Sequence, residues 1–199
     1  MHISEVRYPN LQRLGQLKMS ETTYTKHGKI GRKAHPDVMV IDYDELQKYD
    51  LSIRKDPRGR IYILTIDGKI VKIGGSQAKG GILDTIGAYL GGGKDTGRGA
   101  GKGNSKRTYA VWKYLIEAVK EGKKVEVFFK LLPTSETLVP IPNLFGEDEE
   151  VELKYDFHVY EENLVRHFEK ITGRFPILNT QEAGIKWEDV VDISEHAGM

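Results

Sequence analysis

The dipeptide Asp67-Gly68 constrains the fold of this chain more than any other feature of its sequence. It separates two runs rich in β-branched residues, 61–66 and 69–73. A type I′ turn needs positive φ at both central residues, which Asp-Gly supplies readily, and such a turn joins two antiparallel strands. The sequence therefore predicts a β-hairpin over residues 60–75.

This hairpin places two reactive side chains close together. Tyr62 lies on its first strand and Lys72 on its second, so the ladder brings a phenol near an ammonium. Gly74 and Gly75 follow, and their lack of a side chain lets another molecule approach the backbone closely. A plain structural hairpin is the alternative interpretation, but this pair is unusual for a simple scaffold.

Length and composition indicate a globular protein. The chain of 199 residues is long enough for one compact domain with additions, or for two small ones. It contains no cysteine, which excludes disulfides and thiolate metal sites and is compatible with a reducing compartment. Its start lacks the pattern of a secretory signal, and no apolar run is long enough for a membrane span. We therefore expect a soluble, cytoplasmic protein.

The net charge of +1 is small, but the charges are unevenly distributed. Residues 69–130 hold thirteen Lys and Arg against five Asp and Glu, whereas residues 147–199 hold five against fourteen. A basic middle is compatible with a surface that faces phosphate groups. Unequal solvated faces would give the same counts.

Residues 1–57 show weak periodicity, with a short apolar run at 38–41 and a short helical stretch near 44–49. Between them lies a basic loop, 26–36, interrupted by glycines. Its cations are either solvated or in contact with nucleic-acid phosphates, and the candidates for phosphate contact are Lys29, Arg32 and Lys33.

Twelve of the 22 glycines fall between residues 74 and 103, and the run 91–104 cannot form a stable helix or strand. It is not a phosphate-binding P-loop, because neither Lys94 nor Lys102 is followed by the Ser or Thr that this motif requires. We interpret the run as a flexible basic flap that orders on a polyanion. Its candidate phosphate contacts are Lys94, Arg98 and Lys102.

Apolar spacing predicts two helices and a third strand after the hairpin. The first helix spans 82–90, the second begins after Asn104 or Ser105 and ends at Gly122, and the strand spans 124–131. Lys106 and Arg107 fall in the first turn of the second helix, where the helix dipole disfavours cations and a bound phosphate would relieve that cost. Residues 133–155 form an insertion of uncertain structure.

A last predicted helix, 159–171, carries a carboxylate on its apolar face. Glu161 lies three, four and seven residues before Leu164, Val165 and Phe168, so it shares their stripe. A buried carboxylate must be paired, bind a metal or take part in chemistry. A favourable first-turn interaction with the helix dipole is the alternative. Glu162 points elsewhere, and we expect it to be solvated.

Two motifs of the hairpin resemble the paired signature of the GIY-YIG nucleases. They are Arg60-Ile61-Tyr62 and Lys72-Ile73-Gly74, the second followed by Gly75-Ser76. Arginine stands in place of the first Gly and lysine in place of the second Tyr. A lysine at that position is similar to some restriction endonucleases of the family.

The helix with Glu161 resembles the third element of that family, in which a helix-borne Glu precedes an apolar pair and then a Pro and an Asn, here Pro176 and Asn179. The resemblance covers about residues 59–179. The family also places an arginine on the helix just after its second motif, and 82–90 contains none. Its candidate replacements are Arg107, Arg98 and Lys79, of which Arg107 is favoured because a helix holds it more rigidly than a loop holds Arg98.

The resemblance implies an α+β fold, with a small antiparallel or mixed three-stranded sheet flanked by helices in a nuclease core at 58–180. Residues 1–57 would be an arm for DNA recognition or dimerisation, and 181–199 a tail. The implied activity is sequence-specific, Mg²⁺- or Mn²⁺-dependent hydrolysis of double-stranded DNA by a homodimer, most similar to type II restriction endonucleases, without a small-molecule cofactor or a membrane. An inactive relative, or a repair or homing type, is the alternative.

The resemblance also implies roles for individual residues. Tyr62 and Lys72 would activate water, Arg107 would bind the scissile phosphate, and Glu161 would hold the metal. Ordinary pKa values near 10 and 10.4 make both Tyr62 and Lys72 poor bases, so we expect mutual proximity and a metal to lower them. Glu162, Arg98 and Lys79 are alternates, Ser76 and Lys106 are further DNA contacts, and the six histidines have no assigned role.

Overall fold

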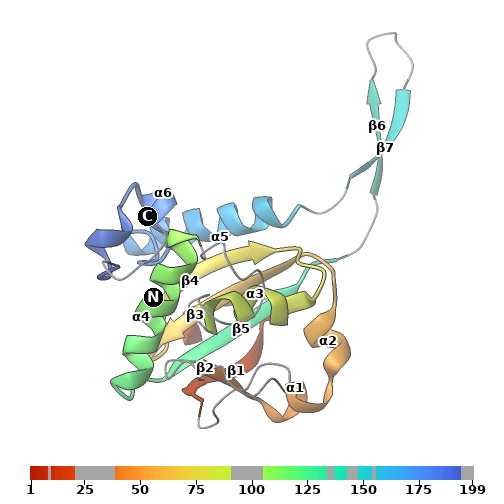
Figure 1. Cartoon of the computed structure of the whole chain (residues 1–199). Coiled ribbons are helices and arrows are strands. Elements are labelled where there is room, and N and C mark those ends of the chain that lie inside the picture. Colours follow the sequence, from red (N-terminus) through yellow and green to blue (C-terminus); the bar gives the residue numbers. More distant parts are fainter. Residues whose placement is uncertain are drawn as a thin grey trace.

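The computed structural model of the chain describes residues 1–8, 10–20, 39–90, 105–133, 137–142, 148–153 and 156–193. Its centre is a five-stranded antiparallel sheet in the order β2-β1-β5-β3-β4, with helices packed on both faces (Figure 1). The fold is therefore α+β, as predicted. The strands of this sheet are β1 (Gln12–Met19), β2 (Met39–Tyr43), β3 (Arg60–Ile66), β4 (Lys69–Ser76) and β5 (Val125–Leu131).

A separate two-stranded hairpin occupies part of the predicted insertion and stands apart from the main sheet in Figure 1. Its strands are β6 (Thr137–Pro142) and β7 (Asp148–Leu153). The helices are η1 (Ile3–Glu5), α1 (Glu45–Tyr49), α2 (Leu51–Lys55), α3 (Gly81–Leu90), α4 (Lys106–Lys120), α5 (Phe157–Thr172), α6 (Thr180–Ala183) and η3 (Trp187–Asp189). In the described ranges, none is long and apolar enough to cross a bilayer.

The predicted hairpin is confirmed as β3 and β4. Both turn residues have positive φ, 48° at Asp67 and 74° at Gly68, as a type I′ turn requires. The register pairs Tyr62 with Gly74 and Leu64 with Lys72. Tyr62 and Lys72 are therefore diagonal neighbours on the same face of the sheet.

The sheet has two more strands than the three that we expected. β1 and β2 come from the N-terminal segment, and β1 pairs with β5 in the same sheet. Their weak periodicity has a physical cause, because the register of β1 shifts between Arg13 and Gly15. Leu14 and Leu17 are both buried although they are an odd number of residues apart, so the alternation of a regular strand is lost.

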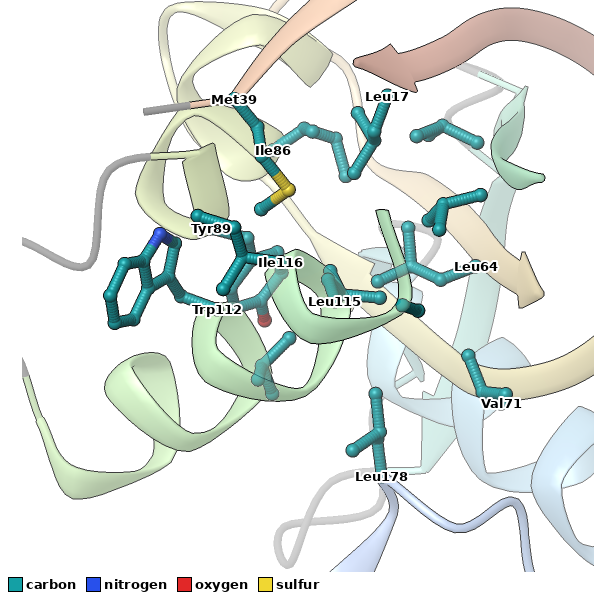
Figure 2. Close-up of a cluster of buried hydrophobic side chains, with 14 of the residues drawn as sticks. Leu17, Met39, Leu64, Val71, Ile86, Tyr89, Trp112, Leu115, Ile116 and Leu178 are labelled. Carbon is teal, nitrogen blue, oxygen red and sulfur yellow. The ribbon is translucent and has the colours of Figure 1, made fainter. Parts of the chain in front are cut away.

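Two apolar layers enclose the sheet. One face packs against α3 and α4, where Leu64, Val71, Ile86 and Leu115 belong to one buried cluster (Figure 2). The opposite face packs against α5, which covers Ile61, Ile63 and Ile73 with Val165 and Phe168, all of them buried. Because β4 is an edge strand, helices on both faces can reach its end.

The described part of the C-terminal segment belongs to this core. Trp187, Val191 and Ile193 are buried in the cluster formed with α3 and α4. Leu178 also lies in this cluster and is labelled in Figure 2. The segment 178–193 thus packs on the same side of the sheet as α4.

The irregularity in β1 gives a stability prediction. Gly15 has φ of 157°, and a Cβ there would lie 2.2 Å from the carbonyl oxygen of Asp42 on β2. We expect Gly15→Ala to destabilise the protein by roughly 2–3 kcal/mol in urea unfolding, because the backbone of β1 or β2 must move to admit the Cβ.

Gly87 is the matched control. A Cβ there meets nothing within 4 Å, so Gly87→Ala in α3 should stabilise by up to about 1 kcal/mol. Equal losses at both positions would contradict the close approach of Asp42 to Gly15.

Candidate active site

The four residues predicted for catalysis come from β4 and from three elements next to it, which are β3, α4 and α5. Tyr62 lies on β3, Lys72 on β4, Arg107 in the first turn of α4 and Glu161 in the second turn of α5. The charges of Arg107 and Glu161 both influence the pKa values of Tyr62 and Lys72. The structure therefore brings the four side chains into one electrostatically coupled group.

Tyr62 is almost fully buried, with 3% of its surface exposed. Its hydroxyl lies 2.9 Å from the hydroxyl of Tyr89 on α3. Its ring lies against Gly74, where a Cβ would be 2.3 Å from the ring carbon Cζ. Burial raises the pKa of Tyr62 well above its ordinary value, and Tyr89 adds to that shift. The protein groups around Tyr62 therefore raise its pKa, because desolvation outweighs the attraction of Arg107.

Lys72 is completely buried, and its Nζ donates a hydrogen bond of 3.2 Å to the carbonyl oxygen of Leu178. Burial, and to a smaller extent the charge of Arg107, lower the pKa of Lys72 from 10.5 to about 8, against the opposing charges of Glu161 and Glu182. A minor but appreciable fraction of Lys72 is then neutral at physiological pH. Of the two groups expected to activate water, only Lys72 has a pKa in that range.

Glu161 is half-buried. Burial raises the pKa of its carboxyl group, while Lys72, Arg107 and a hydrogen bond from the backbone of Gly75 oppose that shift. A Cβ at Gly75 would lie 2.9 Å from Oε2 of Glu161, so this glycine admits the carboxylate. Because α5 begins at Phe157, Glu161 lies beyond the first turn, which weakens the alternative of a simple dipole interaction.

Glu162 has a different environment. It is exposed, and its Oε1 accepts hydrogen bonds of 2.9 and 2.8 Å from Nε and Nη2 of Arg166 one turn further along α5. Its charge is thus already paired at the surface.

Arg107 is the candidate for the missing helix arginine that the structure places at the site. Ser105 caps α4 through its hydroxyl group, and Arg107 follows two residues later. Its Nη1 donates a hydrogen bond of 3.2 Å to Oε1 of Gln181. Lys79 is exposed in the turn before α3 and is not part of the cleft described next, and Arg98 lies outside the described residues.

A cleft of about 650 Å³ is lined by both Arg107 and Glu161. Its floor is the end of β4, one side is α5 and the other is α4 with the C-terminal segment. The lining residues are Gly75, Ser76, Gln77, Arg107, Phe157, His158, Glu161, Glu162, Val165, Arg166, Phe175, Gln181 and Glu182. The cleft joins cationic, anionic and apolar groups, a combination suited to a phosphate ester.

The predicted DNA contacts fall into two groups. Ser76 lines the cleft, and Lys106 is exposed beside it in an ion pair with Glu188. The others, Lys29, Arg32, Lys33, Lys94, Arg98 and Lys102, lie outside the described residues.

Sequence reasoning missed several groups that contact these side chains. The helical spacing of Tyr89 indicates only a core residue, yet its hydroxyl group forms a hydrogen bond with that of Tyr62. Gln181 and Glu182 belong to a segment without a recognisable pattern. Asn179 belongs to the family-like motif, and its side chain pairs with both the N–H and the C=O of Ile73, at 3.0 and 2.9 Å. Three-dimensional contacts alone reveal these roles.

Arg60, which stands in place of a motif glycine, is also completely buried. Its Nε and Nη2 donate hydrogen bonds of 3.0 Å to the carbonyl oxygens of Arg58 and Ala78, respectively. Burial lowers the pKa of its guanidinium group. Arg60 thus connects the start of β3 to the loop that follows β4. That loop leads away from the cleft floor.

The described residues of this site could hold a hard divalent cation through only a few protein ligands. Within the described ranges, no three His, Cys, Asp or Glu side chains are grouped closely enough to form a metal cage. Mg²⁺ commonly takes only one or two carboxylates and keeps several water ligands. The half-buried carboxylate of Glu161 at an open cleft is compatible with that mode, with substrate phosphate completing the ligands.

Comparison with known proteins gives limited information. Neither the models of known protein families nor the sequences of curated proteins match this chain. The solved structure of a bacteriophage T4 EndoII mutant is similar at 15% identity and a TM-score of 0.48, over 85% of this chain and 96% of that one. The restriction endonuclease HPY188I in complex with product DNA is similar at 20% identity and a TM-score of 0.45, over 89% and 84%.

The buried ammonium gives a prediction about pH and stability. A pKa lowered from 10.5 to about 8 corresponds to a penalty of roughly 3 kcal/mol at neutral pH. Between those pH values the unfolded chain holds the Lys72 proton and the native protein has released it, so stability rises with pH. We expect Lys72→Met to equal or exceed wild-type stability at pH 7 and to lose that advantage by pH 10.5 in urea unfolding.

Lys69→Met provides the control for that experiment, because Lys69 is an exposed residue at the other end of β4. Its effect on stability should be the same at both pH values. A difference between Lys72→Met and wild type that does not change with pH would show that Lys72 is not buried as a cation.

The two buried hydroxyl groups give a second prediction. Tyr62→Phe or Tyr89→Phe alone leaves the other hydroxyl without its partner, which costs about 1–3 kcal/mol of unfolding free energy. The double variant should lose less than the sum of the single variants, with a coupling near 1 kcal/mol in chemical denaturation. Strict additivity would mean that the two hydroxyl groups do not interact in solution.

Proposed function

We propose that this protein is a metal-dependent DNA endonuclease that hydrolyses phosphodiester bonds. The observation that carries the proposal is the cleft lined by Arg107 and Glu161 beside the buried Lys72 and Tyr62. A phosphodiester bond needs a cationic group for its phosphate, a base for the attacking water and charge neutralisation at the leaving oxygen. These four side chains offer that combination.

Arg107 would bind the non-bridging oxygens of the scissile phosphate, for which a planar guanidinium group is well suited. Lys72 in its neutral form would accept the proton of the attacking water, since its pKa is lowered to about 8. Tyr62 keeps its proton because its pKa is raised, so its hydroxyl would orient neighbouring groups through hydrogen bonds.

Glu161 would hold the divalent cation, Mg²⁺ or Mn²⁺. Such a cation, when bound, supplies neutralisation of the negative charge that develops on the leaving oxygen. Burial raises the pKa of Glu161, and the charge of a nearby divalent cation would oppose that shift and favour the carboxylate form.

The first test uses supercoiled plasmid, Mg²⁺ and purified protein, with and without a chelator. We expect nicked or linear product only with metal, and a rate at least about 100-fold lower for Glu161→Gln, which keeps the shape but removes the charge. Glu169→Gln, further along α5, is the matched control and should cut normally. Cleavage by Glu161→Gln at the wild-type rate with an inactive Glu162→Gln would move the assignment to Glu162.

We also propose that the protein acts as a sequence-specific homodimer of the type II restriction class. The described part of one chain offers one such cleft, and two copies related by a two-fold axis would cut both strands of a near-palindromic target. The basic segments 26–33 and 91–104, with Lys106 and Ser76, would supply phosphate contacts. The N-terminal segment and the insertion at 133–155 would supply target recognition and the dimer contact.

Sedimentation on a short duplex that carries the target site tests the assembly. We expect two chains per duplex and double-strand cleavage at one sequence. One chain per duplex making a double-strand break, or nicking without sequence preference, would contradict the homodimeric restriction activity and leave a nuclease of another class.

A further inference from the structure

The segment 178–182 contacts the site at several points that the proposed chemistry does not use. The carbonyl oxygen of Leu178 accepts the hydrogen bond of Lys72, and Gln181 accepts that of Arg107. Glu182 lines the cleft and influences the pKa values of both Lys72 and Glu161. One short stretch of chain therefore lies against three of the four proposed site residues.

This stretch is fixed to the edge of β4. The N–H of Leu178 donates to the carbonyl oxygen of Val71 at 2.8 Å, and the side chain of Asn179 pairs with both backbone groups of Ile73. Beyond it, the buried Trp187 packs in the core. The segment is thus bound to the strand that carries Lys72 and, further on, to the core.

Arg107 needs an external partner to hold its orientation. It lies in the first turn of α4, where the helix dipole disfavours a cation, and its long side chain has several rotatable bonds to fix. Its hydrogen bond to Gln181 reaches across the cleft wall from a segment 74 residues away in sequence. A neutral amide orients the guanidinium group without neutralising it, so the full charge stays available for an anion.

We propose that Gln181 is a positioning residue, which holds Arg107 toward the phosphate-binding side of the cleft and couples its orientation to the strand that carries Lys72. The expected effect on catalysis rests on the proposed nuclease function. The orientation of Arg107 by Gln181 does not depend on that function. Gln181→Leu removes the acceptor, and Gln181→Glu keeps one. Ile185→Gln is the control, because Ile185 is an exposed neutral residue three positions after this segment.

The first measurement uses the protein without DNA. The ¹⁵N heteronuclear NOE of the Arg107 Nε–H group reports how rigidly the side chain is held. We expect it to fall in Gln181→Leu to the level of exposed arginines such as Arg174, and to remain near the wild-type value in Gln181→Glu and Ile185→Gln. An unchanged NOE in Gln181→Leu overturns the proposal, whether or not the protein cuts DNA.

The second measurement is the steady-state rate on a cleavable duplex. Misplacing one phosphate-binding group should lower kcat about 10-fold while changing KM less than about 3-fold, because many other contacts hold the duplex. Gln181→Glu should also lose kcat, because its carboxylate would neutralise the charge of Arg107, and Ile185→Gln should cut as wild type does. A kcat of Gln181→Leu equal to that of wild type would overturn the positioning role. Absence of cutting by the wild type would instead contradict the nuclease function, and the NOE would still decide the role of Gln181.

Discussion

The burial of the Lys72 ammonium within an edge strand is the constraint on which the site depends. A cation removed from water is costly unless hydrogen bonds and charges compensate for the lost hydration. The carbonyl oxygen of Leu178 and the charges of Glu161 and Glu182 give partial compensation, whereas Arg107 opposes it. The result is an amine whose protonation changes near neutral pH, next to an open cleft. A surface lysine would have neither property.

The position of β4 at the sheet edge explains how so many elements reach this amine. α5 packs on one face of the sheet and α4 on the other, and segment 178–182 pairs along the free edge. Gly74 and Gly75 let Tyr62 and Glu161 approach the strand, since a Cβ at either position would collide with them. The hairpin, both helix layers and the C-terminal segment therefore depend on one strand.

The sequence predicted those parts of the fold and site that local patterns determine. Asp67-Gly68 fixes the hairpin, Ser105 and Gly122 mark the ends of α4, and apolar spacing places Glu161 on the inner side of α5. The strand β1 escaped prediction because the irregularity at Gly15 removes its alternation. Tyr89 and Gln181 escaped for another reason, since their contacts span 27 and 74 residues of sequence and leave no local signal. The burial that raises the pKa of Tyr62 comes from tertiary packing, which local sequence patterns do not show.

The most direct test of this account is the pKa of Lys72 itself. A pH titration of its ¹⁵Nζ and ¹³Cε resonances, assigned by their absence in Lys72→Met, measures the protonation of this one amine in the free protein. The account predicts a midpoint at about 8, below the ordinary value of 10.5. A midpoint near 10.5 would contradict it, because Lys72 would then be solvated and could not act as the base beside the cleft.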